Sequence, residues 1–131
     1  VGYRNMIMVD TWNRCWRWHY HQWKILIGEN GAGGEIGHMC VNLEETDTCG
    51  CGRHGCLEQY ASATGISRLA RKKMEHETRA TILTKEDLSA KAVFDAVKEG
   101  DEVAIEVATE MGNYLGHAMA DMQQYWIRLY L

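Results

Sequence analysis

Proline is absent from the 131-residue sequence, although it punctuates most domains of this size. No apolar run approaches the length of a membrane-spanning helix, and no signal-peptide pattern opens the chain. Basic residues gather only at positions 68–73, which we interpret as a solvated helix face and not as a nucleic-acid site. Internal repeats and low-complexity linkers are also missing. These absences argue against a membrane span and favour a cytoplasmic protein that forms one domain or part of one.

Five cysteines are present, and the formal net charge is −4. Cysteines in a chain without secretory features indicate a reducing compartment, where disulfides do not persist. Clustered thiols in that setting favour metal ligation. Tryptophan is unevenly placed, because four of the five tryptophans fall within residues 12–23, among His, Arg and Tyr residues.

The residue pattern predicts strands in the first half of the chain and helices in the second. Strands are predicted at residues 3–9, 24–27 and 39–42, with a glycine-rich loop over residues 28–37. Helices are predicted at residues 57–75, 89–98 and 101–122. Gly100 is suited to end the second helix, and Asp101 to cap the third. The third helix carries an apolar stripe of helical period that we expect to face the core: Ala104, Val107, Met111, Leu115 and Ala118.

Three thiols lie within eight residues, at Cys49, Cys51 and Cys56. The glycines between them allow the backbone to fold tightly around a common centre. A lone cysteine is usually a small buried apolar residue, but three at this spacing are not explained in that way. They indicate a structural zinc site, for which three cysteines and one histidine form a common ligand set.

Two imidazoles are candidates for the fourth ligand. His54 lies inside the turn between the thiols and can point outward, whereas His38 follows the glycine-rich loop and can return to the cluster. The spacing of the residues alone does not decide which of the two histidines is the fourth ligand. Cys15 and Cys40 lie outside the pattern and are assigned no ligand role.

The sequence Gly-Ala-Gly-Gly-Glu-Ile-Gly-His at residues 31–38 precedes Cys-Gly-Cys-Gly-Arg-His-Gly-Cys-Leu-Glu at residues 49–58. In order and approximate spacing, these two segments resemble the paired signatures of the ROK family (repressor, open reading frame, kinase). The similarity continues through residues 60–62 and 112–116. A zinc knuckle alone or a glycine loop alone would supply only one of the two segments. The combination of both is therefore specific to the ROK family.

The resemblance implies an α/β protein with a partial actin-like (ROK/hexokinase-type) ATPase fold. Residues 1–131 would be a fragment of the larger lobe of that fold, mainly the part that binds sugar and zinc. Within this fragment, residues 28–60 are the expected sugar- and zinc-binding segment.

Carried over by position, the resemblance assigns sugar binding to three residues and zinc ligation to four. Glu35, His38 and Glu58 are expected to bind sugar hydroxyls, since carboxylates accept hydrogen bonds from vicinal hydroxyls. The expected zinc ligands are His38, Cys49, Cys51 and Cys56. His38 would place one ring nitrogen on the structural zinc and the other toward the sugar, so that the metal orients the pocket without performing chemistry.

The resemblance also implies that intact relatives transfer the γ-phosphoryl group of ATP to a hexose hydroxyl, with Mg²⁺ at the phosphates. Glucose is the expected hexose, with fructose, N-acetylmannosamine and allose as alternatives. The family's general-base Asp lies upstream of Val1, so we expect no catalytic residue in this chain and no kinase turnover by the chain as printed. Sugar-responsive repressors, which bind DNA, are the second class of function. A homodimer without membrane association is expected for the intact protein.

Residues 10–23 depart from the family, which has a glycine-rich phosphate turn at this place. Bulky residues cannot supply the positive φ values or the close approach of glycine. Tryptophan is encoded only by TGG, so reading one base later always yields glycine, and residues 12–18 can then become Gly-Thr-Gly-Val-Gly-Gly-Gly. We therefore predict that residues 10–23 are out of frame. A genuine aromatic loop that stacks nucleic-acid bases is the alternative.

The C-terminal residues 123–131 are predicted to be out of frame on weaker grounds. In another frame, residues 123–130 can become Ala-Ala-Ile-Leu-Asp-Pro-Val-Ile, which resembles the family's continuation and restores a proline. A decayed gene product that keeps only residual zinc binding is the remaining alternative.

Overall fold

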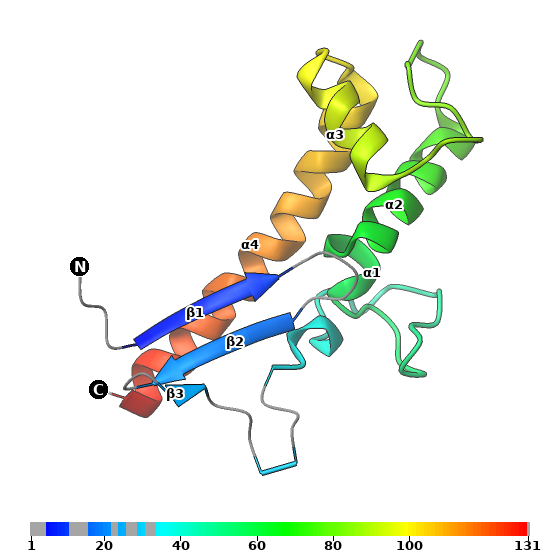
Figure 1. Cartoon of the computed structure of the whole chain (residues 1–131). Coiled ribbons are helices and arrows are strands. Elements are labelled where there is room, and N and C mark those ends of the chain that lie inside the picture. The colour runs from blue at the N-terminus through cyan, green and yellow to red at the C-terminus, as the bar shows by residue number, and fades with distance from the viewer. Residues whose placement is uncertain (1–4, 11–15, 22–23, 26–28, 31–33, 131) are drawn as a thin grey trace.

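The computed structural model describes residues 5–10, 16–21, 24–25, 29–30 and 34–130, and Figure 1 shows the arrangement of their elements. The elements in chain order are β1 (Asn5–Asp10), β2 (Trp16–His21), β3 (Lys24–Ile25), η1 (Ile36–His38), α1 (Glu58–Ala61), α2 (Ala63–His76), α3 (Ala90–Lys98) and α4 (Glu102–Tyr130). The long helix α4 runs the length of the molecule and contacts α1, α2 and α3 (Figure 1). Among the described residues, no helix combines the length and apolar composition that crossing a membrane requires.

The strands form an antiparallel three-stranded sheet in the order β1-β2-β3. The β1–β2 register runs from Asn5 opposite His21 to Asp10 opposite Trp16. The strand predicted at residues 3–9 is confirmed over residues 5–9, and that at 24–27 over its first two residues. Residues 3–4 and 26–27 lie outside the described residues, as do residues 11–15 and 22–23 of the segment predicted to be out of frame. The frame of residues 10–23 and 123–131 is a property of the gene and stays a prediction.

The helix predicted at residues 57–75 is confirmed over residues 58–61 and 63–75, but it is interrupted at Ser62, which divides it into α1 and α2. Ser62 adopts an extended conformation (φ −81°, ψ 165°), and its hydroxyl caps α2 by accepting from the Gly65 backbone N–H at 3.0 Å. A Cβ atom on Gly65 would lie 2.5 Å from the carbonyl oxygen of Glu58. The start of α2 therefore packs directly on the backbone of α1, and glycine permits this approach.

The last two helices begin where the sequence predicts. Ser89 accepts from the Ala92 backbone N–H at 3.1 Å, and Asp101 accepts from that of Ala104 at 2.9 Å. Gly100 has a φ of +84°, as expected for the residue that ends α3. The predicted end of α4 at residue 122 is wrong, because the helix continues to Tyr130. Neither glycine nor proline follows Met122 to stop it.

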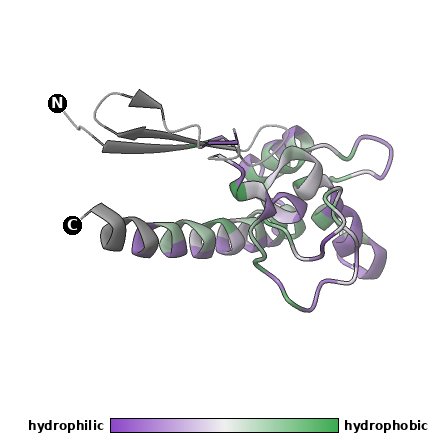
Figure 2. Ribbon diagram, turned by 90° about the horizontal axis from the view of Figure 1, so that it is seen from below, coloured by the Kyte–Doolittle hydropathy of each residue, from purple (hydrophilic) through white to green (hydrophobic). Residues whose placement is uncertain are grey.

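Two apolar clusters form the core, and α1 contributes a residue to each, Tyr60 to the first and Ala61 to the second. The first joins α2, α3 and the beginning of α4, and the second joins η1, α1, Val9 of β1 and the later part of α4. In the predicted α4 stripe, Ala104, Val107 and Ala118 are buried, whereas Met111 and Leu115 pack at the cluster edges. Figure 2 shows hydrophobic and hydrophilic residues alternating along α4, as expected for a helix packed on one side.

Candidate metal and sugar site

The thiol loop (residues 47–56) carries all three clustered cysteines and folds back on itself. Thr48 and His54 form an antiparallel bridge across it. Inside this bridge, Cys49 N–H donates to the Arg53 carbonyl at 2.7 Å, and Gly52 N–H donates to the Cys49 carbonyl at 2.8 Å. The bridge and these bonds turn Cys49 and Cys51 toward the end of the loop.

Gly55 brings the segment that follows His38 against the end of the thiol loop. Its φ is +69°, and a Cβ atom on it would lie only 1.7 Å from the Asn42 carbonyl oxygen. The Gly55 carbonyl accepts from the Val41 N–H at 2.8 Å. The strand predicted at residues 39–42 is wrong, because these residues make only a single bridge, between Cys40 and Cys56. This bridge still places the segment after His38 next to Cys56, so that His38 lies near the cysteines.

Ligand atoms of His38, Cys49, Cys51 and Cys56 all lie within 4.8 Å of one another. The Cys51 and Cys56 Sγ atoms are 3.6 Å apart, and Cys49 Sγ lies 3.8 Å from His38 Nδ1. Three sulfurs and one imidazole nitrogen are a donor set that suits tetrahedral zinc. The residues present therefore fit the metal. His54 is exposed in the thiol loop and does not belong to this group.

The three thiols differ in their surroundings. Burial raises the pKa of Cys56 to about 12 and also raises the pKa of Cys49. Hydrogen bonds from the backbone and side chain of Arg53 lower the pKa of the exposed Cys51 to about 6. Since metals bind thiolates, zinc binding at this cluster would release protons, mainly from the two buried thiols.

His38 lies between two carboxylates, one on each side of its ring. Its Nε2 is 3.9 Å from Glu35 Oε2, and its Nδ1 is 3.8 Å from Glu58 Oε1. Glu35 precedes η1, whereas Glu58 is the first residue of α1. The structure therefore brings together the three residues that the sequence assigns to the sugar.

Glu58 also contacts the metal cluster, because Cys49 Sγ donates to its Oε1 at 3.1 Å. An open pocket of about 280 Å³ borders the cluster on the α2 side, between Cys49 and Arg68. Of the three predicted sugar ligands, only Glu58 lines it, and Glu35 and His38 lie outside its lining.

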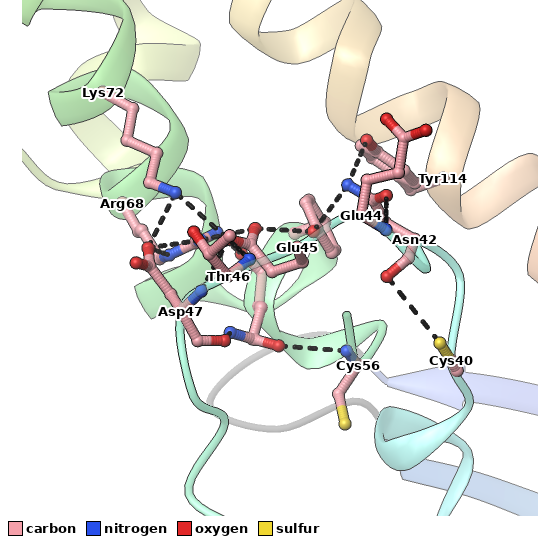
Figure 3. Close-up of polar contacts among 12 residues, drawn as sticks. Cys40, Asn42, Glu44, Glu45, Thr46, Asp47, Cys56, Arg68, Lys72 and Tyr114 are labelled. Carbon is pink, nitrogen blue, oxygen red and sulfur yellow. Dashed lines mark hydrogen bonds and ion pairs between the residues drawn. The ribbon is translucent and has the colours of Figure 1, made fainter. Parts of the chain in front are cut away.

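A polar network that no sequence pattern indicates fastens the thiol loop to α2 (Figure 3). Its centre is the Glu45 carboxylate, whose side chain is only 7% exposed. Glu45 accepts from the Tyr60 hydroxyl at 2.6 Å and pairs with Arg68 at 2.5 Å. Arg68 and Lys72 both continue to the Asp47 carboxylate, at 2.6 and 2.7 Å. In sequence, an acidic stretch at residues 44–47 has the pattern of a solvated turn, so nothing local distinguishes the buried acid.

The charge of Glu45 is stabilised in this network. Burial acts to raise the pKa of its carboxyl group, but bonds from Tyr60, the Asp47 backbone, Arg68 and Lys72 outweigh burial and hold the pKa well below its usual range. The opposite effect is seen at Tyr60, where burial and the bond to Glu45 raise the pKa of the phenol. The ionised acid thus ties the loop before Cys49 to the helices behind it.

A family model for the ROK family matches residues 21–126. The chain is 36% identical over 125 residues to a glucokinase of Halalkalibacterium halodurans, covering 92% of this chain and 38% of that protein. It is 34% identical over 100 residues to an N-acetylmannosamine kinase of Yersinia pestis, covering 76% and 30%. The chain thus spans about a third of the length of these relatives.

Solved structures show the same architecture. A ROK family glucokinase from Streptomyces griseus, in complex with glucose and AMPPNP, superposes with a TM-score of 0.83 at 24% identity, covering 95% of this chain and 42% of that one. A ROK family transcriptional regulator, a homologue of the E. coli MLC protein, gives a TM-score of 0.79 at 28% identity, covering 92% and 30%. The predicted α/β fold, part of the actin-like ATPase fold, is confirmed.

Proposed function

The chain belongs to the ROK family, and from this premise we propose that it forms the zinc-supported sugar-binding part of an ATP-dependent hexose kinase. Glucose is the proposed substrate, because the H. halodurans relative, at 36% identity, is a glucokinase. The relative from Y. pestis, at 34% identity, acts on a different hexose derivative by its name, so N-acetylmannosamine is the first alternative. Fructose and allose are the further alternative substrates.

The observation that carries the proposal is the position of His38. Its Nδ1 faces Cys49 Sγ at 3.8 Å, while its Nε2 faces Glu35 at 3.9 Å. One imidazole can therefore serve a metal with one nitrogen and a neighbouring ligand with the other. Zinc, when bound, supplies a fixed centre that sets the tautomer and orientation of this ring.

The carboxylates on either side of His38 suit the recognition of a polyhydroxylated ligand. Glu35 and Glu58 can each accept hydrogen bonds from hydroxyl groups, and His38 Nε2 can complete the set. A site of this kind rejects analogues that lack a hydroxyl, because its polar groups are then left unpaired. We propose that Glu35, His38 and Glu58 select and orient the sugar.

Positioning and electrostatics dominate phosphoryl transfer, so orienting the sugar hydroxyl toward ATP is a large part of the catalysis. We assign no general base among the residues described, and we propose that the base, the ATP phosphates and Mg²⁺ are held elsewhere in the intact protein. A cytoplasmic homodimer is the proposed form of that protein.

A sugar-responsive transcriptional regulator is the second candidate. The observation that favours it is the TM-score of 0.79 to the ROK transcriptional regulator, at 28% identity. The same sugar and zinc residues would then serve a sensor instead of an enzyme. DNA binding by the complete gene product, released by a hexose, would support this candidate.

The test is a coupled assay of ATP turnover on the complete gene product that contains this chain, with glucose, N-acetylmannosamine, fructose and allose in parallel. Turnover of glucose is the result expected, and Glu35→Gln should reduce it about 10- to 100-fold, because a hydrogen bond to a charged group contributes about 1.5–3 kcal/mol. A zinc-loaded, folded protein that phosphorylates none of the four sugars would refute the kinase.

A further inference from the structure

Gln59 is a buried residue of α1 whose side-chain amide is bonded at both ends. Its Oε1 accepts from the backbone N–H of Cys56 at 3.0 Å, and its Nε2 donates to the Asp47 carbonyl oxygen at 2.9 Å. The residue is only 8% exposed, so water does not readily replace either bond. No motif in the sequence assigns a role to Gln59.

The two bonds of Gln59 meet the two ends of the thiol loop. Asp47 is its first residue and Cys56 its last, and the other two thiols lie between them. The loop is also closed inside by the Thr48–His54 bridge, but that bridge does not tie it to α1. One side chain therefore anchors both ends of the loop to the helix that carries Glu58.

From this geometry we propose that Gln59 is a positioning residue of the metal site, which holds the thiol loop closed so that its three sulfurs converge on His38. The inference rests on the zinc site of the proposed function and adds a residue outside the paired motifs. A loop that is closed before the metal binds loses less conformational entropy on binding. Residues that orient metal ligands in this way typically contribute a factor of about 10 to 100 in metal affinity.

Removal of the Gln59 amide should leave the rest of the fold in place. Arg68 and Lys72 hold the Asp47 carboxylate independently, at 2.6 and 2.7 Å. The Cys40–Cys56 bridge holds the far end of the loop against the segment after His38. A loss of metal affinity without a loss of helical structure would therefore separate positioning from a general structural role.

The experiment compares four forms of the 131-residue chain: wild type, Gln59→Met, Gln59→Glu and Gln124→Met. Methionine has a similar size and removes both bonds, whereas glutamate keeps the acceptor for Cys56 N–H and loses the donor to Asp47. Gln124→Met makes the same chemical change at an exposed position of α4. Zinc affinity is measured by competition with a chromophoric chelator, the ligand field by the absorption bands of bound Co²⁺, and helix content by circular dichroism of the metal-free protein.

Gln59→Met is expected to weaken zinc binding about 10- to 100-fold and to shift the Co²⁺ bands, with unchanged helix content. Gln59→Glu should lie between it and wild type, and Gln124→Met should match wild type. Equal zinc affinity and identical Co²⁺ bands in wild type and Gln59→Met would overturn the inference while leaving the metal site standing. If Gln59→Met does not fold, wild-type affinity in Gln59→Glu would overturn it. A wild-type chain that binds no zinc would refute the metal site itself.

Discussion

Substitution of Gly55 by alanine tests the closure of the thiol loop most directly. Gly55 combines two constraints, a φ of +69° and a Cβ position 1.7 Å from the Asn42 carbonyl oxygen. Two other glycines of the same loop allow the effect of the positive φ to be measured apart from the effect of the close contact. Gly52 has a φ of +84° with nothing within 4 Å of its Cβ position, and Gly50 is free of both.

The three positions predict a graded loss of stability. Gly50→Ala should be near neutral. Gly52→Ala should cost about 1–2 kcal/mol, since a residue with a Cβ atom is strained in the left-handed region. Gly55→Ala carries the same strain and must also move residue 42 away, which breaks the 2.8 Å bond between Val41 N–H and the Gly55 carbonyl. The lost bond adds about 1 kcal/mol, and the displaced backbone raises the total to about 3 kcal/mol or more.

Thermal unfolding of the zinc-loaded chain, followed by circular dichroism, gives the order of the three variants. For a domain of this size, about 3 kcal/mol corresponds to a Tm decrease of roughly 10 °C. Zinc affinity should fall in the same order, because Gly55 also keeps His38 next to the cysteines. Equal Tm values for Gly52→Ala and Gly55→Ala would show that the close approach to Asn42 does not constrain the loop.

Three further predictions concern the helices, the buried acid and the metal. Gly65→Ala should lower the Tm, since its Cβ atom would meet the Glu58 carbonyl oxygen at 2.5 Å. The matched helical control Gly112→Ala has nothing within 4 Å of its Cβ position and should raise the Tm, since alanine favours a helix over glycine by about 1 kcal/mol. Tm changes of the same sign for both variants would contradict this. Because the pKa of Glu45 is held below its usual 4.5, its stabilisation is complete above about pH 5 and is lost as the pH falls through the folded pKa. Glu45→Gln should therefore lower the Tm at pH 7 and flatten its acid dependence, and an unchanged slope of Tm against pH would refute the assignment. Removal of zinc by a chelator should lower the Tm, and the Tm should vary with the logarithm of the free zinc concentration. Calorimetry at several zinc concentrations measures this dependence. A Tm that is independent of zinc would show that metal binding is not linked to folding.

The fold could be predicted where the signals are local. Ser89, Gly100 and Asp101 set the start and end of their helices through their own side chains or φ values, and the structure keeps these boundaries. The break at Ser62 has a local cap, the Ser62 hydroxyl that accepts from Gly65 N–H, but it also requires the close approach of Gly65 to the carbonyl of Glu58. That contact exists only once the two helices pack. The end of α4 was missed for a different reason, since the expected terminator does not exist in the sequence.

In the candidate site, too, the features set by neighbouring residues could be predicted from the sequence, whereas those set by distant residues could not. The spacing of Cys49, Cys51 and Cys56 predicts a cluster from sequence alone. Spacing left His38 and His54 open, and the structure puts His38 next to Cys49 through the contact of Gly55 with Asn42. Neither Gln59 nor Glu45 has a sequence signal, because burial of a polar residue depends on partners far away in the chain.

The proposed sugar residues come from two segments, and the thiol loop lies between these segments in the sequence. Glu35 and His38 belong to the segment around η1, and Glu58 begins α1 directly after Cys56. The backbone contact between them is the bond from Leu57 N–H to the Met39 carbonyl at 2.8 Å, next to the Cys40–Cys56 bridge. A metal held by His38 from one segment and by cysteines from the other would fix the distance between the carboxylates. Preorganisation of this kind reduces the conformational entropy that the site loses when a sugar binds, which would give the proposed zinc a role in the proposed kinase that is separate from phosphoryl transfer.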